Sequence, residues 1–349
     1  MDWVKKYATA AAWTNLRLTP LQHGAGQCAY SGSMEKILVL GGAGYVGATV
    51  CELLVRQGYK VTVPTRRLVN ARHLQHLPTV NLVQMDVHDA AALERAVTGH
   101  DAVVNLIAIL HGSPAAFDKV HVDLPKILVK ACLAQGVGKL VHISALGVDG
   151  AHPGSGPSGY LRSKERGEAV LLQAVAGSGL ELTMLRPSII FGAKDKFLNL
   201  FAKLQSVFPV MPLAGANARF QPVWVHDVAM AVVRSLEQGV ARSPTGDAVR
   251  ILEACGPDVF SLKELVQLSA QLSGVRQGRG RPVFALPDWM GRLQARMMEL
   301  APGEPLMSRD NLDSMKVDNV ATGKVPGLEV LGIRPAALRP IAAQYLRRA

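Results

Sequence analysis

The chain has 349 residues, of which 49% are hydrophobic and 19% charged, and its formal net charge is +11. No apolar run reaches the roughly 18 residues that a membrane span requires, so no transmembrane helix is predicted. Long basic runs are absent and only 5% of the residues are aromatic, which argues against a nucleic-acid partner. The positive charge instead suits a phosphate-rich cofactor, an acidic partner or an anionic membrane surface.

The first 33 residues contain one acid, Asp2, and one arginine, Arg17, whereas residues 34–36 lead directly into a strand pattern. We interpret 1–33 as an extension outside the fold, either disordered or produced by a misassigned start. The alternative is an organelle-targeting segment, because acid-poor amphipathic starts have this character.

From residue 36 onward, apolar strand patterns alternate with helical patterns. Strands are predicted at residues 36–40, 60–63, 81–85, 102–107, 139–143 and 181–186, and helices at 45–57, 90–97, 117–135 and 160–176. Nearly continuous apolar strands separated by helices predict an α/β fold, a doubly wound parallel sheet of Rossmann type with helices on both faces. Ligands of such sheets bind beyond the carboxyl ends of the strands.

The pattern becomes less regular after residue 186. Helices are predicted at 199–207, 227–237, 262–272, 288–300 and 336–346, and short strands at 222–225 and 250–253. We therefore expect residues 34–190 to form a dinucleotide-binding domain. Residues 191–349 are expected to form a smaller lobe on the substrate side, interleaved with that domain.

A glycine-rich turn joins the first strand to the first helix, with the spacing Gly41-x-x-Gly44-x-x-Gly47. The first glycine permits a tight turn, the second lets the backbone approach a pyrophosphate, and the third lets the helix pack on the strand. The helix that begins at Tyr45 and Val46 would then present N–H groups and its positive dipole end to the phosphates. The turn predicts dinucleotide binding; the alternative is a tight connection without a ligand.

The end of the second strand indicates which dinucleotide is bound. An NAD site usually has an acid there, about 20 residues after the glycines, to bind the ribose 2′-hydroxyl. Here no acid lies between Glu52 and Asp86, and the strand ends at Arg66 and Arg67. Because arginine is the fork-shaped partner of a 2′-phosphate, NADP(H) is favoured over NAD(H). The alternative is that both arginines are solvated surface charges.

Further cofactor contacts are predicted after the third and fourth strands. Asp86, followed by Val87, would accept a hydrogen bond from the adenine amino group; the alternative is that Asp86 caps the next helix. The segment that begins at Asn105 would run beside the ribose and the pyrophosphate, unless it is only a buried strand. The predicted contacts in that segment are Leu106, Ile107 and Ala108.

Ser144, Tyr160 and Lys164 form a candidate catalytic group. Tyr160 and Lys164 are four residues apart and share one helix face. A nearby ammonium lowers the pKa of a phenol toward that of a working base, and it also grips a nicotinamide ribose. Ser144, at the end of the fifth strand, would polarise a substrate carbonyl. The alternative is that Tyr160 and Lys164 only hold cofactor or face solvent.

Four segments resemble one family. They are residues 185–192 (LRPSIIFG), 195–199 (DKFLN), 220–229 (FQPVWVHDVA) and 308–312 (SRDNL). The chain resembles the extended and atypical short-chain dehydrogenases/reductases, in the branch that contains the nucleotide-binding accessory subunit of respiratory complex I and its bacterial relatives. The resemblance implies tightly held NADP(H), with Pro187 and Ser188 near the nicotinamide. It also implies a respiratory-complex or membrane-protein partner, on the cytoplasmic or matrix side and peripheral to the inner membrane.

Two departures from the family pattern bear on catalysis. His121 stands where many extended members carry an asparagine that shapes the proton relay, and the interval from Ser144 to Tyr160 is short for an active extended dehydrogenase. Both departures argue against turnover and leave nucleotide binding untouched. His121 itself lies on an apolar helix face, so we expect a hydrogen-bonded core histidine.

Three functions compete at this point. The first is a protein that holds NADP(H) for structure or regulation and serves a membrane-bound respiratory complex or its assembly. The second is an active oxidoreductase or epimerase acting on a nucleotide sugar, a sterol-like alcohol or a quinone precursor. The third is a nucleotide sensor, which the retained Tyr160 and Lys164 argue against.

Two remaining features concern the cysteines and one late helix. The four cysteines are far apart without a CxxC pair, which argues against zinc and against a disulfide framework, so we expect inert thiols and no metal. They are Cys28, Cys51, Cys132 and Cys255.

The predicted helix 288–300 carries an apolar stripe with Arg292 and Arg296 toward another side. We expect the stripe to pack against the smaller lobe; the alternative is that it rests on a membrane subunit or an anionic bilayer. Its members are Trp289, Met290, Leu293, Met297 and Leu300.

Overall fold

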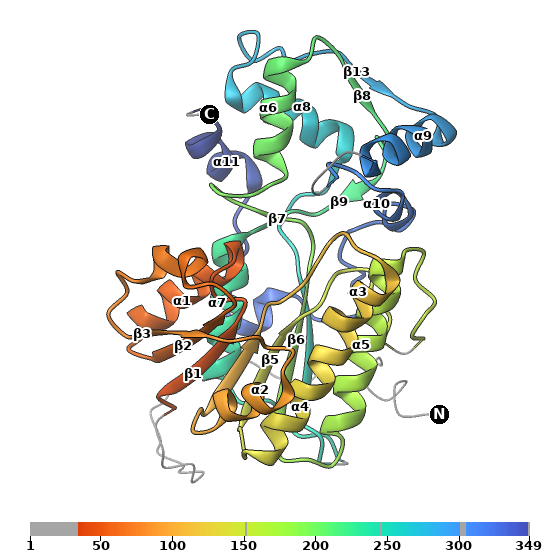
Figure 1. The fold of residues 1–349 in the computed structure, drawn as a ribbon. Coiled ribbons are helices and arrows are strands. Elements are labelled where there is room, and N and C mark those ends of the chain that lie inside the picture. The colour runs from red at the N-terminus through yellow and green to blue at the C-terminus, as the bar shows by residue number, and fades with distance from the viewer. Residues whose placement is uncertain (1–33, 151, 245, 301–304, 348–349) are drawn as a thin grey trace, which may run out of the picture.

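The computed structural model describes residues 34–150, 152–244, 246–300 and 305–347. The extension predicted at 1–33 and the thiol of Cys28 lie outside these ranges. Seven strands form one parallel sheet in the order β11-β6-β5-β4-β1-β2-β3 (Figure 1). The strands are β1 (Lys36–Leu40), β2 (Lys60–Thr65), β3 (Val80–Gln84), β4 (Ala102–Asn105), β5 (Lys139–Ile143), β6 (Glu181–Pro187) and β11 (Val249–Ala254). The predicted doubly wound α/β fold is thereby confirmed.

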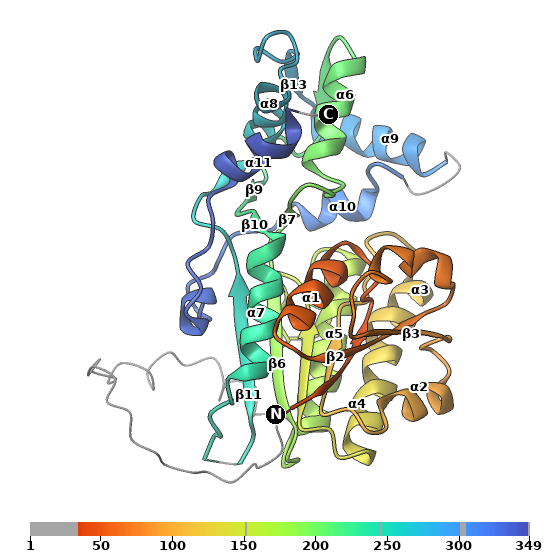
Figure 2. The same ribbon diagram turned by 90° about the vertical axis from the view of Figure 1, so that its left-hand side faces the viewer.

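Helices cover both faces of the sheet because its strands are apolar on both faces; four of the five residues of β1 are fully buried. One apolar cluster lies beneath α1 and α7, which pack together (Figure 2). The second lies beneath α2, α4 and α5. These helices are α1 (Tyr45–Arg56), α2 (Ala90–Val97), α4 (Leu124–Ala134), α5 (Gly159–Val175) and α7 (Val225–Glu237).

The helix predicted over residues 117–135 is instead divided in three. It consists of α3 (Pro114–Asp118), the π-helical turn η4 (Lys119–Asp123) and α4. Pro125 has no N–H to donate to the carbonyl of His121, four residues earlier, so the α-helical ladder cannot continue there. Gly167 of α5 also packs against that carbonyl, where a Cβ atom would overlap the oxygen. Neither cause is visible in the helical periodicity.

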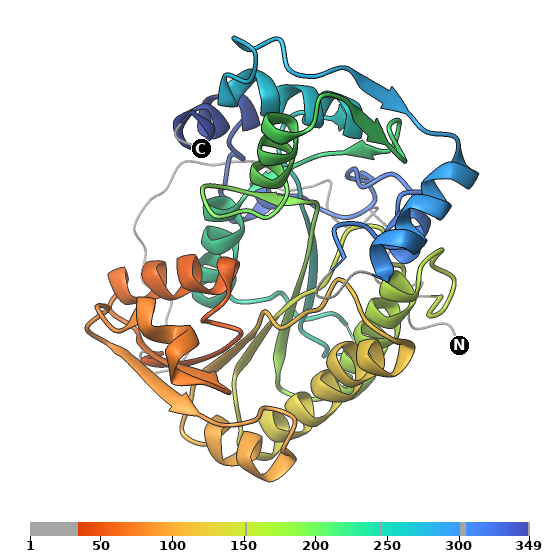
Figure 3. The ribbon, with the colours of Figure 1, turned by 45° about the horizontal axis from the view of Figure 1, so that its top comes forward.

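The smaller lobe lies beyond the carboxyl ends of the strands (Figures 1 and 3). Its helices are α6 (Leu198–Val207), α8 (Leu262–Ser273), α9 (Asp288–Glu299), α10 (Arg309–Ser314) and α11 (Leu338–Leu346). Its short strands are β7 (Ile190–Phe191), β8 (Met211–Leu213), β9 (Arg219–Phe220), β10 (Val223–Trp224), β12 (Phe260–Ser261) and β13 (Val283–Ala285). Short 3₁₀ turns complete the described elements, η3 (Leu68–Leu74) and η5 (Leu328–Leu331).

Two late elements lie in the main domain and not in that lobe. Strand β11 pairs with β6 in the main sheet, and α7 packs on α1. The reason is burial: Val228 and Val232 of α7 are fully buried in the same apolar cluster as Val39 of β1.

The described cysteines are buried, as is expected of inert thiols. Cys51, Cys132 and Cys255 are buried and free of disulfides, and burial raises the pKa of each thiol to about 12. Within the described ranges, no helix is both long and apolar enough to cross a membrane.

Candidate nucleotide-binding site

The glycine turn after β1 is forced by close backbone contacts. Gly41 has φ +80°, a left-handed conformation that favours glycine. A Cβ atom on Gly47 would overlap the carbonyl oxygen of Gly41, and one on Gly42 would lie 2.8 Å from a methyl group of Val63. Helix α1 therefore packs directly on the turn, as the spacing predicted, and Gly42 adds a constraint that the sequence did not reveal.

The N-terminus of α1 is left without a protein cap. Gly44 occupies the N-cap position with no side-chain hydrogen bond, and the first turn contains no acid. The first N–H groups of a helix have no intrahelical partner, so this end is suited to an anion. Val46 is half-buried on the core side. The hydroxyl of Tyr45 is buried without a hydrogen-bond partner among the described residues, and burial, followed by the charge of Asp195, raises its pKa.

Arg66 and Arg67 follow β2 directly and are both exposed. The hydroxyl of Thr65 donates to the carbonyl of Arg67 at 3.1 Å, which holds the turn. Neither guanidinium forms an ion pair with any residue that the structure describes. Both are therefore available to a phosphate, and the 2′-phosphate assignment stays a prediction.

Asp86 does not cap the next helix. Its carboxylate accepts from the backbone N–H of His88 at 3.0 Å, whereas the N-cap of α2 is Asp89, which accepts from two N–H groups. The capping alternative for Asp86 was therefore wrong. Asp86 remains exposed at the carboxyl edge of the sheet and Val87 beside it is buried.

The segment after β4 lies against the glycine turn. A Cβ atom on Gly41 would lie 3.2 Å from the backbone of Leu106 and from the side chain of Ile107. The buried amide of Asn105 accepts from the N–H of Ile107 at 3.2 Å and pairs with Nδ1 of His142 at 3.1 Å. Leu106 and Ile107 are half-buried and Ala108 is exposed. The structure thus brings this predicted cofactor segment beside the predicted phosphate turn.

Ser144 and Lys164 meet at the end of β5. The Nζ of Lys164 donates to the carbonyl of Ile143 at 3.0 Å, and the adjacent Ser144 hydroxyl is buried without a hydrogen-bond partner among the described residues. Burial lowers the pKa of Lys164 to about 8, against the opposing charge of Glu168. Glu168 in turn accepts from Arg186 at 2.9 Å. The site therefore rests on buried charges that the sequence did not reveal.

Tyr160 does not have the lowered pKa that a base requires. Its half-buried ring makes edge contacts with His121 and Phe117, at centroid distances of 5.5 and 6.2 Å, and burial raises its pKa. The expected activation of Tyr160 by the ammonium of Lys164 is not seen. Its catalytic role stays a prediction.

His121 is a hydrogen-bonded core histidine, as expected. Its Nε2 accepts from the N–H of Ile109 at 3.2 Å, so Nδ1 carries the proton and donates to the hydroxyl of Ser163 at 2.8 Å. The hydroxyl of Ser163 donates to the carbonyl of Tyr160. Burial, followed by the charge of Lys164, lowers the pKa of His121 and keeps the ring neutral.

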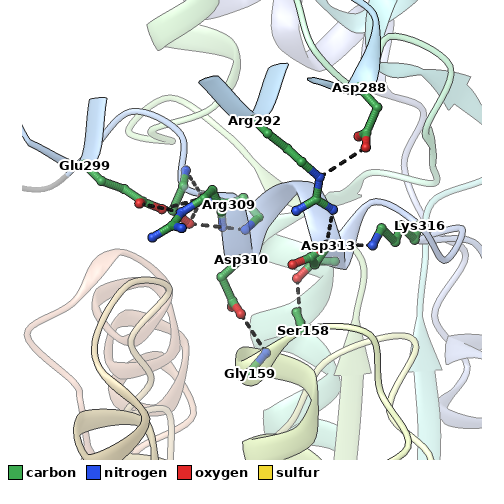
Figure 4. Close-up of polar contacts among 12 residues, drawn as sticks. Ser158, Gly159, Asp288, Arg292, Glu299, Arg309, Asp310, Asp313 and Lys316 are labelled. Carbon is green, nitrogen blue, oxygen red and sulfur yellow. Dashed lines mark hydrogen bonds and ion pairs between the residues drawn. The ribbon is translucent and has the colours of Figure 1, made fainter. Parts of the chain in front are cut away.

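The start of α5 is capped from two sides (Figure 4). Ser158 accepts from the N–H of Leu161, and the carboxylate of Asp310 on α10 accepts from Gly159 at 2.6 Å and Tyr160 at 3.1 Å. In the sequence, Asp310 stood out only as part of the segment 308–312 that resembles the family. Its contact with Tyr160 spans 150 residues, so no local pattern indicates it.

Pro187 ends β6, Ser188 follows it, and both are buried. The carbonyl of Pro187 accepts from the N–H of Leu146 at 3.0 Å. The hydroxyl of Ser188 bonds to the side-chain oxygen of Asn319 at 2.6 Å. Both residues lie beside the end of β5, and their contact with a nicotinamide stays a prediction.

The resembling run 195–199 has a structural role. Asp195 accepts from the N–H groups of Phe197 at 2.9 Å and Leu198 at 2.7 Å, which caps α6. Its other oxygen accepts from the hydroxyl of Tyr345 on α11 at 2.8 Å. The motif thereby holds the last helix onto the lobe.

Comparison with known proteins agrees with this geometry. The NAD dependent epimerase/dehydratase family matches residues 37–251, from β1 to β11. The chain belongs to this family. The match confirms the expected membership and, at the level of the family, an NAD(P)-type cofactor.

Individual relatives match a longer part of this chain than residues 37–251. Subunit 9 of the NADH dehydrogenase [ubiquinone] 1 alpha subcomplex from Mus musculus is 29% identical over 89% of this chain and 79% of its own length. The NADH-ubiquinone oxidoreductase 40 kDa subunit of Neurospora crassa is 28% identical over 88% and 78%. The UDP-glucose 4-epimerase of Thermus thermophilus shares the fold, with a TM-score of 0.64 over 90% of this chain and 99% of that one at 20% identity.

Proposed function

We propose that this protein holds NADP(H) for a structural or regulatory purpose and serves a membrane-bound respiratory complex or its assembly. One observation carries the proposal: the glycine turn leaves no room for a Cβ atom at Gly47, whereas the Nζ of Lys164, which would activate Tyr160, donates to the carbonyl of Ile143. Together with likeness to complex I subunits along most of the chain, this favours binding without turnover.

The residues at the carboxyl edge fit the cofactor. A Cβ atom would not fit at Gly42 or Gly47 in the glycine turn, and the uncapped start of α1 is suited to the pyrophosphate. Arg66 and Arg67 would hold the 2′-phosphate. Asp86 and Val87 would border the adenine, and Leu106 to Ala108 the ribose. Pro187 and Ser188 would lie toward the nicotinamide, which in bound NADP(H) exchanges hydride.

The same residues give little support for proton transfer. Lys164 donates to the carbonyl of Ile143 and burial raises the pKa of Tyr160. A phenol whose pKa is raised above its ordinary value abstracts a proton less readily at neutral pH. The cofactor is therefore proposed as an ordering element for the carboxyl edge.

The partner and the location belong to the same proposal. The two relatives described above are, by name, subunits of NADH–ubiquinone oxidoreductases. We propose a respiratory-complex partner for this chain, with peripheral association at the inner membrane from the cytoplasmic or matrix side.

Nucleotide analysis of the purified protein tests the proposal. We expect NADP(H) to copurify and no turnover to appear with carbonyl, alcohol or nucleotide-sugar substrates. Cofactor that leaves the protein on dialysis, or a steady rate with any of these substrates, would contradict it.

A second function is favoured by the buried, unpartnered hydroxyl of Ser144 at the end of β5. In that case the chain is an NADP-dependent oxidoreductase or epimerase for a nucleotide sugar, a sterol-like alcohol or a quinone precursor. Ser144 would polarise the carbonyl, Tyr160 would act as base and Lys164 would orient the ribose. Tyr160→Phe should then remove nearly all turnover and leave NADPH bound; an undiminished rate rules Tyr160 out as the base.

A further inference from the structure

Helix α9 exposes its large apolar residues instead of burying them, which corrects the expectation that the stripe packs against the lobe. The side chains of Trp289, Leu293, Met297 and Leu300 are 67, 54, 66 and 81% exposed. Their spacing places them on one face of the helix. The described residues give this face no covering element.

The inner face of α9 is held by small residues and ion pairs. Gly291 and Ala295 are buried, and a Cβ atom on Gly291 would lie 2.6 Å from the Cβ of Ala214. Arg292 bonds to Asp288 on α9 at 3.1 Å and to Asp313 on α10 at 2.7 Å (Figure 4). The helix therefore cannot rotate its stripe inward without breaking these contacts.

The smaller lobe exposes further large apolar residues near α6 and β13. Strand β13, which precedes α9, pairs with β8, which follows α6. Figure 1 shows β8 and β13 side by side, leading toward α9. The exposed large apolar residues are Val207, Phe208, Val210 and Phe284.

The charges around the stripe favour an anionic partner. Residues 276–300 contain two acids, and both are paired: Asp288 with Arg292 and Glu299 with Arg309. Arg296 borders the stripe, is exposed and has no ion-pair partner in the part of the chain that the structure describes. The arginines of this segment are Arg276, Arg279, Arg281, Arg292 and Arg296.

We propose that the outer face of α9 docks in the plane of an anionic phospholipid bilayer. The twelve residues of α9 are about 18 Å long, too short to span the hydrocarbon core. Apolar side chains that include a tryptophan, bordered by arginine, are the composition of helices that lie in the membrane interface. Trp289, Leu293 and Met297 would enter the acyl boundary and Arg296 would contact the phosphates. The proposal deepens the membrane part of the proposed function and does not depend on the cofactor.

Flotation with defined vesicles tests the docking face. We expect the full-length protein to bind vesicles of phosphatidylglycerol and phosphatidylcholine, to release them at high salt, and to bind pure phosphatidylcholine weakly. The double variant Trp289→Ser with Leu293→Ser should lower binding by about tenfold or more. Arg296→Glu should lower it by about fivefold or more. The matched control, Leu133→Ser with Val330→Ser, alters two exposed apolar residues elsewhere and should bind like the unmodified protein.

Melting temperature and NADPH titration of each variant separate the possible failures. An unmodified protein that binds NADPH but no anionic vesicles overturns the docking face and leaves the nucleotide proposal intact. Equal binding to neutral and anionic vesicles overturns the role of charge. A melting temperature lowered only in the Trp289–Leu293 variant shows a packed stripe, and a dimer that this variant dissociates shows that a second copy covers the face; either result overturns the proposal.

Discussion

Two helices begin at the carboxyl edge of the sheet, on opposite sides of it (Figure 3). Their N-termini differ in whether protein side chains cap them. Helix α1 begins at Gly44 without a side-chain cap. Helix α5 is capped by Ser158 and by the carboxylate of Asp310 from the smaller lobe. A helix N-terminus attracts an anion until protein groups satisfy it. The comparison therefore favours α1 over α5 for the proposed phosphate contacts, and it gives α5 a connection to the lobe.

The largest expected effect is the loss of the phosphate turn. In Gly47→Ala the added Cβ atom overlaps the carbonyl of Gly41, and we expect NADPH affinity to fall by roughly a hundredfold or more. Calorimetric titration measures it. Gly179→Ala is the matched control, because nothing lies within 4 Å of its new methyl group, and it should bind normally. Unchanged affinity in Gly47→Ala contradicts the assignment.

Helix α5 carries a titrating lysine that α1 lacks. Burial lowers the pKa of Lys164 from 10.5 to about 8, so between these pH values the unfolded chain binds more protons. The contribution of Lys164 to stability is therefore smallest below pH 8 and rises as the pH increases through the window. As the pH rises through this window, the unfolding free energy of the unmodified protein should increase by up to ~3 kcal/mol relative to that of Lys164→Met. Urea melts across the window measure it, and a pH-independent difference refutes it.

The edge near α1 is also expected to select the type of dinucleotide. Arg66→Glu should weaken NADPH binding by about tenfold or more, with a much smaller change for NADH, because it removes a charge-assisted contact to the 2′-phosphate. Arg95→Glu makes the same charge change on α2 and serves as the control. If calorimetry gives equal losses for both dinucleotides, the 2′-phosphate assignment fails.

The smallest expected effect is on the cap of α5. Asp310→Ala removes the acceptor of two backbone N–H groups and should lower the unfolding free energy by about 1–2 kcal/mol without affecting NADPH affinity. Asp318→Ala, which removes an exposed ion pair with Arg219, should cost far less. A loss of NADPH affinity in Asp310→Ala, measured by the same titration, would mean that the two helix starts are not independent.

The sequence predicted the parts of the fold that local pattern determines. The strands from 36 to 186 and the start of α1 at Tyr45 agree with the structure because apolar runs and glycine spacing act over a few residues. The cap at Asp310, the return of α7 to the sheet and the exposed stripe at Trp289 depend on contacts between distant segments. Periodicity shows that α9 has an apolar face, but it carries no information on whether another element covers it.

Amide hydrogen exchange tests the comparison most directly. The first N–H groups of α1, at Tyr45, Val46 and Gly47, lack intrahelical partners, whereas those of Gly159 and Tyr160 already donate to Asp310. On addition of NADPH, we predict slowed exchange at Tyr45 to Gly47 and little change at Gly159 and Tyr160. Protection at the start of α5 with none at the start of α1 would contradict the assignment of the phosphates.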